Sequence, residues 1–202
     1  ARQLAEIYTG LRQARYVDVL NQLLTDSFKQ LTGLARVMIY RFDEEWNGEV
    51  IAETVEPSLG SYLHLHYPAA DIPAIARKLY EVNPWRYIQD AAAAKVDIVG
   101  LDPTHPLDLT LADLRSVSPM HVQYLVNMHV RSSFSIAIRL FDKLWGLVVC
   151  HNPAPTALPR SIRSLCYDLV IKYRFCLSEI ITRENISRLD NHHRFVRGFF
   201  QA

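Results

Sequence analysis

Hydrophobic positions spaced three or four residues apart predict the first two helices of the chain. Between residues 16 and 31 the apolar residues fall at this spacing, which is typical of a helix that buries one face, and Gly33 ends it. A second helix is expected after Asp71, which would cap it, with Pro73 in its first turn and Pro84 at its end.

Two further helices follow from the same spacing in the second half of the chain. Ser118 and Pro119 form a start signal for a short helix that reaches Val130. The apolar stripe over residues 159–189 predicts a final helix that is longer than one domain needs. Such a helix often continues into a neighbouring domain or packs against a dimer partner.

Alternating and β-rich runs predict two hairpins. The first joins residues 36–42 to residues 49–55, and Asn47-Gly48 between them is a strong turn signal. The second joins residues 132–140 to residues 143–151. With strands adjacent in pairs and helices around them, the expected fold class is α+β, an antiparallel sheet flanked by helices.

One long segment between the two hairpins has no clear periodicity. Residues 89–118 contain two prolines and a single short apolar run, so they predict an irregular connector of 30 residues. Connectors of this length inside a compact domain are usually functional.

Composition narrows the classes of function. The 202 residues are 50% hydrophobic and 21% charged, with a formal net charge of +1, which offers no strongly basic surface for a nucleic acid. The longest apolar runs are too short for a transmembrane helix, and the first residues lack the pattern of a signal peptide. Three cysteines provide no disulfide framework, so we expect a cytoplasmic protein.

The usual signatures of enzymes and metal sites are missing. No phosphate-binding glycine loop, zinc-protease helix, paired-cysteine motif or nucleophile elbow occurs, so we expect no catalytic residues. His64 and His66 have a spacing that can bind a metal, but a polar strand or loop explains them better because no third ligand is nearby. We therefore predict no metal site.

Two arginines near helix ends indicate an anionic ligand. Arg86 follows the second helix, and Arg115 precedes the helix that carries His121 and Tyr124 on one face. Together with the tyrosines, they would suit a large, partly aromatic dicarboxylate. The residues alone leave this hypothesis about even with ordinary structural roles.

Several motifs then agree on one family. Pro68-Ala69-Ala70-Asp71-Ile72-Pro73 resembles the Pro-Ala-Ser-Asp-Ile-Pro signature of the chromophore-binding GAF domain of phytochromes. Residues 114–125 (LRSVSPMHVQYL), 144–151 (LWGLVVCH) and 38–50 resemble further motifs of that family in the same order. The resemblance extends over residues 15–185.

The resemblance implies a linear tetrapyrrole, biliverdin or a related bilin, in a red and far-red light sensor. Asp71, the backbone at Ile72 and His121 would meet the pyrrole nitrogens, and His151 would bond the carbonyl of the ring that rotates on illumination. The other residues implied to line this site are Tyr40, Tyr67, Pro73, Tyr80, Arg86, Arg115, Ser118, Met120, Tyr124, Ser133 and Ser135. Among these, the arginines and serines would hold the propionates and the tyrosines would surround the rotating ring.

Four positions depart from the family pattern. Met120 stands where plant members carry the attachment cysteine, which is similar to the bacterial subclass, whose cysteine lies upstream of a PAS domain. Because Cys150, Cys166 and Cys176 match no attachment site, non-covalent binding is expected. Ala70 replaces a serine, Asn152 replaces a histidine, and His129 stands where glycine is usual.

The same resemblance implies the surrounding organisation. Residues 1–185 would form the GAF domain with its lasso-like connector, and residues 186–202 a linker helix towards a missing downstream domain. An upstream PAS domain, downstream PHY and kinase-type domains, and a homodimer through the long helix are expected, with any kinase activity in the absent domains.

Two alternatives to a light sensor remain. The chain could be a bilin-free GAF dimerisation or interaction module, or a haem or small-molecule sensor that uses His121 or His151.

Overall fold

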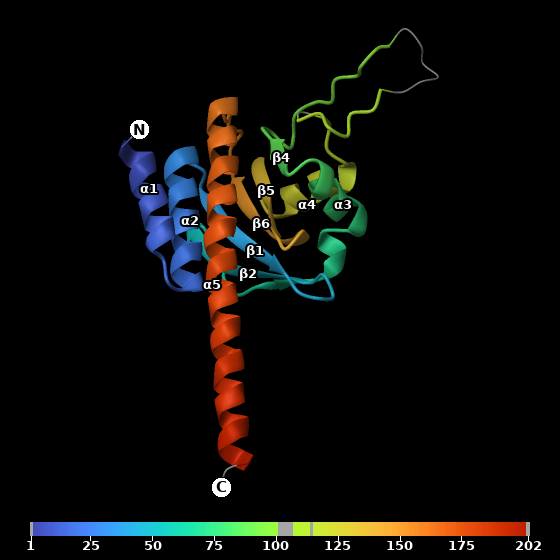
Figure 1. Cartoon of the computed structure of the whole chain (residues 1–202). Coiled ribbons are helices and arrows are strands. Elements are labelled where there is room, and N and C mark those ends of the chain that lie inside the picture. Colours follow the sequence, from blue (N-terminus) through green and yellow to red (C-terminus); the bar gives the residue numbers. More distant parts are fainter. Residues whose placement is uncertain (1, 101–106, 114, 201–202) are drawn as a thin grey trace.

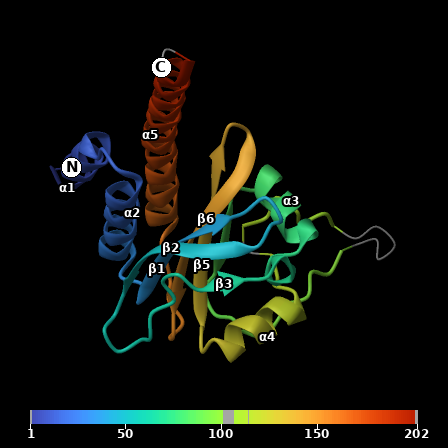
Figure 2. The same cartoon turned by 90° about the horizontal axis from the view of Figure 1, so that it is seen from below.

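One antiparallel sheet organises the molecule. The computed structural model describes residues 2–100, 107–113 and 115–200, and for residues 190–200 only the backbone. Six strands lie in the order β3-β2-β1-β6-β5-β4, and each strand is antiparallel to its neighbours. Helices α1, α2 and α5 cover one face, whereas α3 and α4 lie on the other (Figures 1 and 2). The α+β fold expected from the sequence is confirmed.

The strands and helices have the following bounds. The strands are β1 (Arg36–Phe42), β2 (Gly48–Val55), β3 (His66–Tyr67), β4 (Trp85–Ile88), β5 (Ser132–Leu140) and β6 (Lys143–Asn152). The helices are α1 (Arg2–Gln13), α2 (Val17–Thr32), the 3-10 turn η1 (Ala69–Asp71), α3 (Ala74–Val82), α4 (Pro119–Asn127) and α5 (Arg160–Phe200).

The alternation of side chains along each strand separates two environments. On β1, Val37 and Ile39 are fully buried in the main core under the helices, whereas Met38 and Tyr40 belong to a second cluster on the opposite face. This follows from the two-residue period of a strand, which sends successive side chains to opposite faces. The second face is the one that α3 and α4 leave partly open.

The helical layer fixes the long helix α5 against α2. Tyr173 of α5 is fully buried and donates a hydrogen bond to Asn21 Oδ1 of α2 over 2.6 Å. Further along α5, Arg183 donates to the backbone carbonyl of Arg15 over 2.8 Å. Beyond the domain the helix continues away from the sheet (Figure 1). Its first half therefore belongs to the core, and its second half projects from it.

The two predicted helix caps differ in outcome. Ser118 caps α4 as expected, because its hydroxyl accepts a hydrogen bond from the backbone N–H of His121 over 3.2 Å. The cap predicted at Asp71 is wrong, since α3 begins only at Ala74, after Pro73. An N-cap side chain bonds the N–H of the second or third residue that follows it. For Asp71 these residues are Pro73, which has no N–H, and Ala74, which receives no side-chain cap because the N-cap position falls on Pro73. Asp71 instead ends the turn η1.

Two backbone details refine the turn predictions. Trp46, rather than the Asn47-Gly48 pair, takes the left-handed conformation between β1 and β2, with φ of 69°, and Gly48 is already the first residue of β2. His129, at a position where the resembling family has glycine, also lies in the left-handed region, with φ of 55°. That conformation is the one glycine adopts most easily, which explains the family preference.

The connector between β4 and α4 is irregular wherever it is described. Its base is fixed because Arg131 makes two 2.8 Å hydrogen bonds to the carboxylate of Asp90. From there the chain runs outwards and returns to the edge of the sheet beside β4 (Figure 1).

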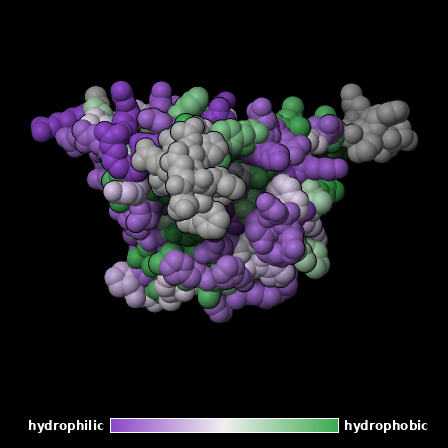
Figure 3. Space-filling model, turned by 60° about the horizontal axis from the view of Figure 1, so that its bottom comes forward, coloured by the Kyte–Doolittle hydropathy of each residue, from purple (hydrophilic) through white to green (hydrophobic). Residues whose placement is uncertain are grey.

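One face of the molecule is mainly polar. Polar residues predominate on the face shown in Figure 3, and the hydrophobic areas there are small and separate. Among the described residues, no helix combines the length and the apolar character that crossing a membrane requires.

Candidate ligand-binding site

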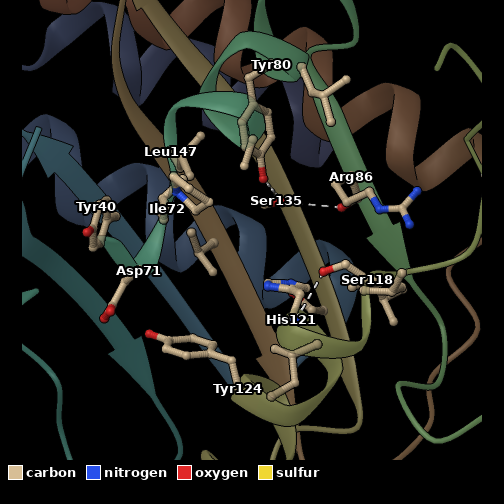
Figure 4. Close-up of a pocket in the computed structure, with 18 of the residues that line it drawn as sticks. Tyr40, Asp71, Ile72, Tyr80, Arg86, Ser118, His121, Tyr124, Ser135 and Leu147 are labelled. Carbon is tan, nitrogen blue, oxygen red and sulfur yellow. Dashed lines mark hydrogen bonds between the residues drawn. The ribbon is translucent and has the colours of Figure 1, made fainter. Parts of the chain in front are cut away.

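A deep cavity of about 760 Å³ lies between the open face of the sheet, α3, α4 and the end of the connector. This volume is within the range of about 300–1,000 Å³ that small-molecule sites occupy. Its walls are mostly apolar, with polar groups at a few points (Figure 4). Such a combination is typical of a site for a large organic ligand.

The structure brings every residue of the predicted site to this one cavity. They come from parts of the chain that are distant in sequence and meet here: Tyr40, Tyr67, Asp71, Ile72, Pro73, Tyr80, Arg86, Arg115, Ser118, Met120, His121, Tyr124, Ser133, Ser135 and His151. Met120 differs from the rest because its side chain is 82% exposed at the rim.

Aromatic side chains form one end of the cavity. The ring of Tyr40 lies 5.9 Å from that of Tyr67 and contacts Phe42 edge-on at 5.3 Å. Its place depends on Gly48, because a Cβ at that position would overlap the Tyr40 ring. Burial raises the pKa of Tyr40 to about 12, so its hydroxyl stays protonated at neutral pH. Figure 4 shows this hydroxyl on the same side of the cavity as the Asp71 carboxylate and Tyr124.

The loop that carries Asp71 is held by a residue that the sequence did not single out. Arg77 of α3 donates hydrogen bonds to the carbonyls of Ile72 (2.6 Å) and Ala69 (3.3 Å). Its guanidinium also lies 4.6 Å from the ring centre of Trp46. Arg77 therefore positions Asp71 and Ile72 without lining the cavity itself.

A chain of hydroxyl groups crosses the floor from α3 to β4. The hydroxyls of Tyr80 and Ser135 are 2.7 Å apart, and Ser135 in turn donates to the backbone carbonyl of Arg86 over 3.5 Å. Burial raises the pKa of Tyr80, which keeps it neutral. These contacts attach α3 to the edge of the sheet beside the arginines.

Two arginines provide the positive charge of the site. Arg86 Nη2 donates to the carbonyls of Arg115 (2.6 Å) and Ser116 (3.1 Å), whereas its Nη1 is buried with no partner among the described residues. Arg115 Nη1 donates to the carbonyl of Ala112 over 3.0 Å. Burial and the nearby Arg115 lower the pKa of Arg86 to about 10. An anion placed here would favour the charged form of Arg86 and so offset that shift.

Two histidines face the cavity as neutral rings. Burial, followed by the charge of Arg36 and by His121, lowers the pKa of His151 to about 3, and its Nδ1 has no partner in the part of the chain that is described. Burial and then Arg86 also lower the pKa of His121, whose ring stacks on Tyr124 at 6.2 Å. A neutral imidazole has one donor and one acceptor nitrogen, so both rings suit polar atoms of a ligand.

One more buried polar group borders the cavity. Asn83, at the end of α3, is 6% exposed, and its Nδ2 has no partner among the described residues. Nothing in the sequence pattern singles out Asn83, because an asparagine before a proline is common in turns. Asn83, Arg86 and His151 thus each place at the border of the cavity a buried nitrogen that has no hydrogen-bond partner among the described residues. Oxygen atoms of a ligand would supply the missing partners.

The remaining candidate residues lie outside the cavity. His64 takes a left-handed conformation beside Glu49, and no group of three metal-ligating side chains occurs in the described ranges. Cys150 and Cys166 are buried in the helical core, where burial raises the pKa of both thiols, and Cys176 lies on α5. None of the three cysteines lines the cavity.

Comparison with known proteins connects this geometry to a family. The GAF domain family matches residues 17–165. Cyanobacterial phytochrome B of Nostoc sp. is 50% identical over 150 residues, which are 73% of this chain and 20% of that protein. A bacteriophytochrome of Pseudomonas aeruginosa is 47% identical over 143 residues, or 69% of this chain and 20% of that protein. The chain thus spans about a fifth of the curated relatives it matches.

Solved structures agree with the sequence relatives. The bacteriophytochrome RpBphP3 from R. palustris superimposes with a TM-score of 0.89 and 30% identity, covering 98% of this chain and 40% of that one. The chromophore-binding domain of Stigmatella aurantiaca phytochrome P1 gives a TM-score of 0.81 and 40% identity, covering 88% of this chain and 58% of that one.

Proposed function

The chain belongs to the GAF domain family, in the branch formed by the chromophore-binding domains of phytochromes, and on this premise we propose that its cavity binds biliverdin non-covalently and senses red and far-red light. The observation that carries the proposal is the pair of arginines beside orphaned buried nitrogens in a large apolar cavity. A linear tetrapyrrole has this chemistry: flat apolar rings, two carboxylates and terminal carbonyls.

The arginines hold the carboxylates. The buried Nη1 of Arg86 has no partner in the described part of the chain, and Arg115 lies nearby. Two guanidinium groups therefore offer charge-assisted hydrogen bonds at one end of the cavity. Ser118, Ser133 and Ser135 line the same cavity and add neutral donors.

The centre of the site serves the pyrrole nitrogens. The carboxylate of Asp71 and the carbonyl of Ile72 accept hydrogen bonds, and Arg77 holds their loop in place. Neutral His121 lies across the cavity from Asp71 (Figure 4). Together these groups keep the chromophore protonated near neutral pH, because a carboxylate stabilises a cation beside it.

The aromatic end and His151 surround the part of the ligand that moves. When bound, the bilin supplies absorption of red light and a terminal ring that rotates. Tyr40, Tyr67 and Tyr124 form apolar walls with neutral hydroxyls, whereas Tyr80 lies nearer the arginines, bonded to Ser135. The Nδ1 of His151, which has no partner among the described residues, bonds the carbonyl of that ring. We propose signalling, not catalysis, as the output of this domain.

The proposal extends to the longer protein. We propose an upstream PAS domain, downstream PHY and kinase-type domains, a cytoplasmic location and a homodimer formed through α5. The relatives are about five times longer than the matched segment, which supports the presence of further domains. The projecting half of α5 is a suitable link to them.

The deciding experiment is an absorbance titration with biliverdin before and after red and far-red illumination. We expect saturable binding, a red-absorbing band and a reversible light-driven shift, together with complete loss of pigment in a denaturing gel stained by zinc fluorescence. A chain that leaves the biliverdin spectrum unchanged is a bilin-free interaction module instead. A Soret band on addition of haem, with no response to biliverdin, would indicate a haem sensor.

A further inference from the structure

The part of the connector that returns to the sheet holds the edge strand β4 from both faces. We call residues 107–113 and 115–118 the returning limb. On the cavity face, Arg86 of β4 donates to the limb carbonyls of Arg115 and Ser116. On the helix face, the indole Nε1 of Trp85 donates to Asp113 Oδ1 over 2.9 Å. Because adjacent strand residues point to opposite faces of a sheet, Trp85 and Arg86 bind the limb on opposite faces of β4.

Asp113 also reaches the long helix. Its Oδ2 lies 3.9 Å from Nη1 of Arg163, in the first turn of α5. Arg163 is only 9% exposed, and its guanidinium lies 4.9 Å from the ring centre of Tyr87 and 5.7 Å from that of Trp85. A buried cation is costly without an anion beside it. Asp113 supplies that anion to a side chain whose Nε has no partner among the described residues.

The limb in turn presents the second arginine of the cavity. Arg115 lies two residues after Asp113, and its guanidinium is directed by a 3.0 Å hydrogen bond to the carbonyl of Ala112. Arg86 is directed by the limb carbonyls described above. The positions of both guanidinium groups therefore depend on where the limb lies, and Asp113 is the limb side chain that attaches it to the sheet and to α5.

We propose that Asp113 is a positioning residue for carboxylate recognition: it fixes the returning limb so that Arg86 and Arg115 face the two acid groups of the ligand. The inference rests on the proposed function, because it takes a dicarboxylate as the occupant of the cavity. Asp113 does not touch the cavity, and it acts through the two arginines. It also joins the carboxylate end of the cavity to the start of α5 through Arg163.

Measuring the affinity for two forms of one ligand shows whether Asp113 positions the arginines or only stabilises the packing of the cavity. Biliverdin carries two free acids, whereas its dimethyl ester has the same rings without the charges. For Asp113→Ala we expect the dissociation constant of biliverdin to rise about threefold to tenfold, the range for one lost hydrogen bond, and that of the ester to change less than twofold. Asp113→Asn keeps an acceptor for Trp85 and should lie between the wild type and Asp113→Ala.

A second measurement needs no ligand. Arg115 is a trypsin site within the limb, and Lys95 is one in the outgoing half of the connector. In Asp113→Ala the cleavage at Arg115 should accelerate several-fold relative to that at Lys95, since cleavage follows the population of the detached limb. Asp108→Asn is the matched control, because Asp108 bonds only the nearby N–H of Thr110 in the described structure. We expect it to match the wild type in both assays.

The outcomes are distinct. Equal losses for biliverdin and its ester would overturn the positioning role, and unchanged cleavage at Arg115 would overturn the attachment of the limb. If Asp113→Ala does not fold, Trp85→Phe removes the same donor and keeps an aromatic ring. If the wild type binds neither form of the pigment, the proposed function fails, and trypsin cleavage alone decides whether Asp113 fixes the limb.

Discussion

The buried, neutral His151 makes the stability of the fold depend on pH in a defined direction. Its pKa is about 3 in the folded chain, against an ordinary value of 6.5. As the pH falls below about 6.5, the unfolded chain binds a proton on this residue, and the folded chain does so only near pH 3. The free energy of unfolding therefore decreases on acidification. At one pH unit below 6.5, protonation of His151 in the unfolded chain lowers the free energy of unfolding by about 1.4 kcal/mol.

Comparison with a non-titrating variant isolates this contribution from that of the carboxylates. We expect His151→Gln to be less stable than the wild type at pH 7.5, and the gap to shrink by about 1.4 kcal/mol at pH 5.5. Urea unfolding followed by circular dichroism at both values measures it. His64→Gln is the control for the replacement of a histidine as such, since the His64 side chain is 73% exposed and lies outside the cavity.

Parallel pH profiles for the wild type and His151→Gln would refute the reasoning. Such a result would mean that water or a carboxylate reaches the ring in solution and that His151 titrates normally. It would also remove the argument that a neutral imidazole nitrogen awaits the ligand.

Three further predictions concern the ligand. Replacement of Arg86 by Met should weaken biliverdin binding by about 2 kcal/mol, or roughly thirtyfold, in an absorbance titration; an unchanged affinity would contradict the carboxylate contact. Asp71→Asn should leave binding largely intact but lower the apparent pKa of the bound chromophore or block photoconversion, because the charge is lost; identical pH titrations and photoconversion would reduce Asp71 to a structural residue. Met120→Cys, at the exposed rim beside His121, should create a covalent adduct visible by zinc fluorescence in a denaturing gel, and pigment retained by the unchanged chain would overturn non-covalent binding.

The spacing of apolar residues predicted the elements that bury a whole face. It did not predict the elements whose stability depends on pairing or packing with another element. The hairpin strands and α2 have regular apolar spacing, and the structure confirms them. Strand β4 has only four residues and exists because it pairs with β5, a contact between positions almost 50 residues apart. Helix α1 was likewise not predicted, although it packs against α2 and α5. Short edge strands and peripheral helices take their stability from tertiary contacts, which local spacing does not contain.

The sequence likewise predicted the residues that line the cavity but not those that hold them in place. Motif resemblance brought together the residues that line it, from Tyr40 to His151. The residues that hold those liners in place, Arg77 and Asp113, were not identified, because each acts through a backbone carbonyl or a side chain elsewhere in the fold. Asn83 was not identified either, since its orphaned amide becomes unusual only once its burial is known.

The last contacts of α5 with the domain set how far the rest of the helix reaches. The helix has 41 residues, and at 1.5 Å per residue it is about 60 Å long. Ile180 is buried in the core, and Arg183 is still bonded to the carbonyl of Arg15. The part of the helix beyond Arg183 is about 25 Å long. A following domain or a second copy of the helix can therefore be met about 25 Å away from the last of these contacts.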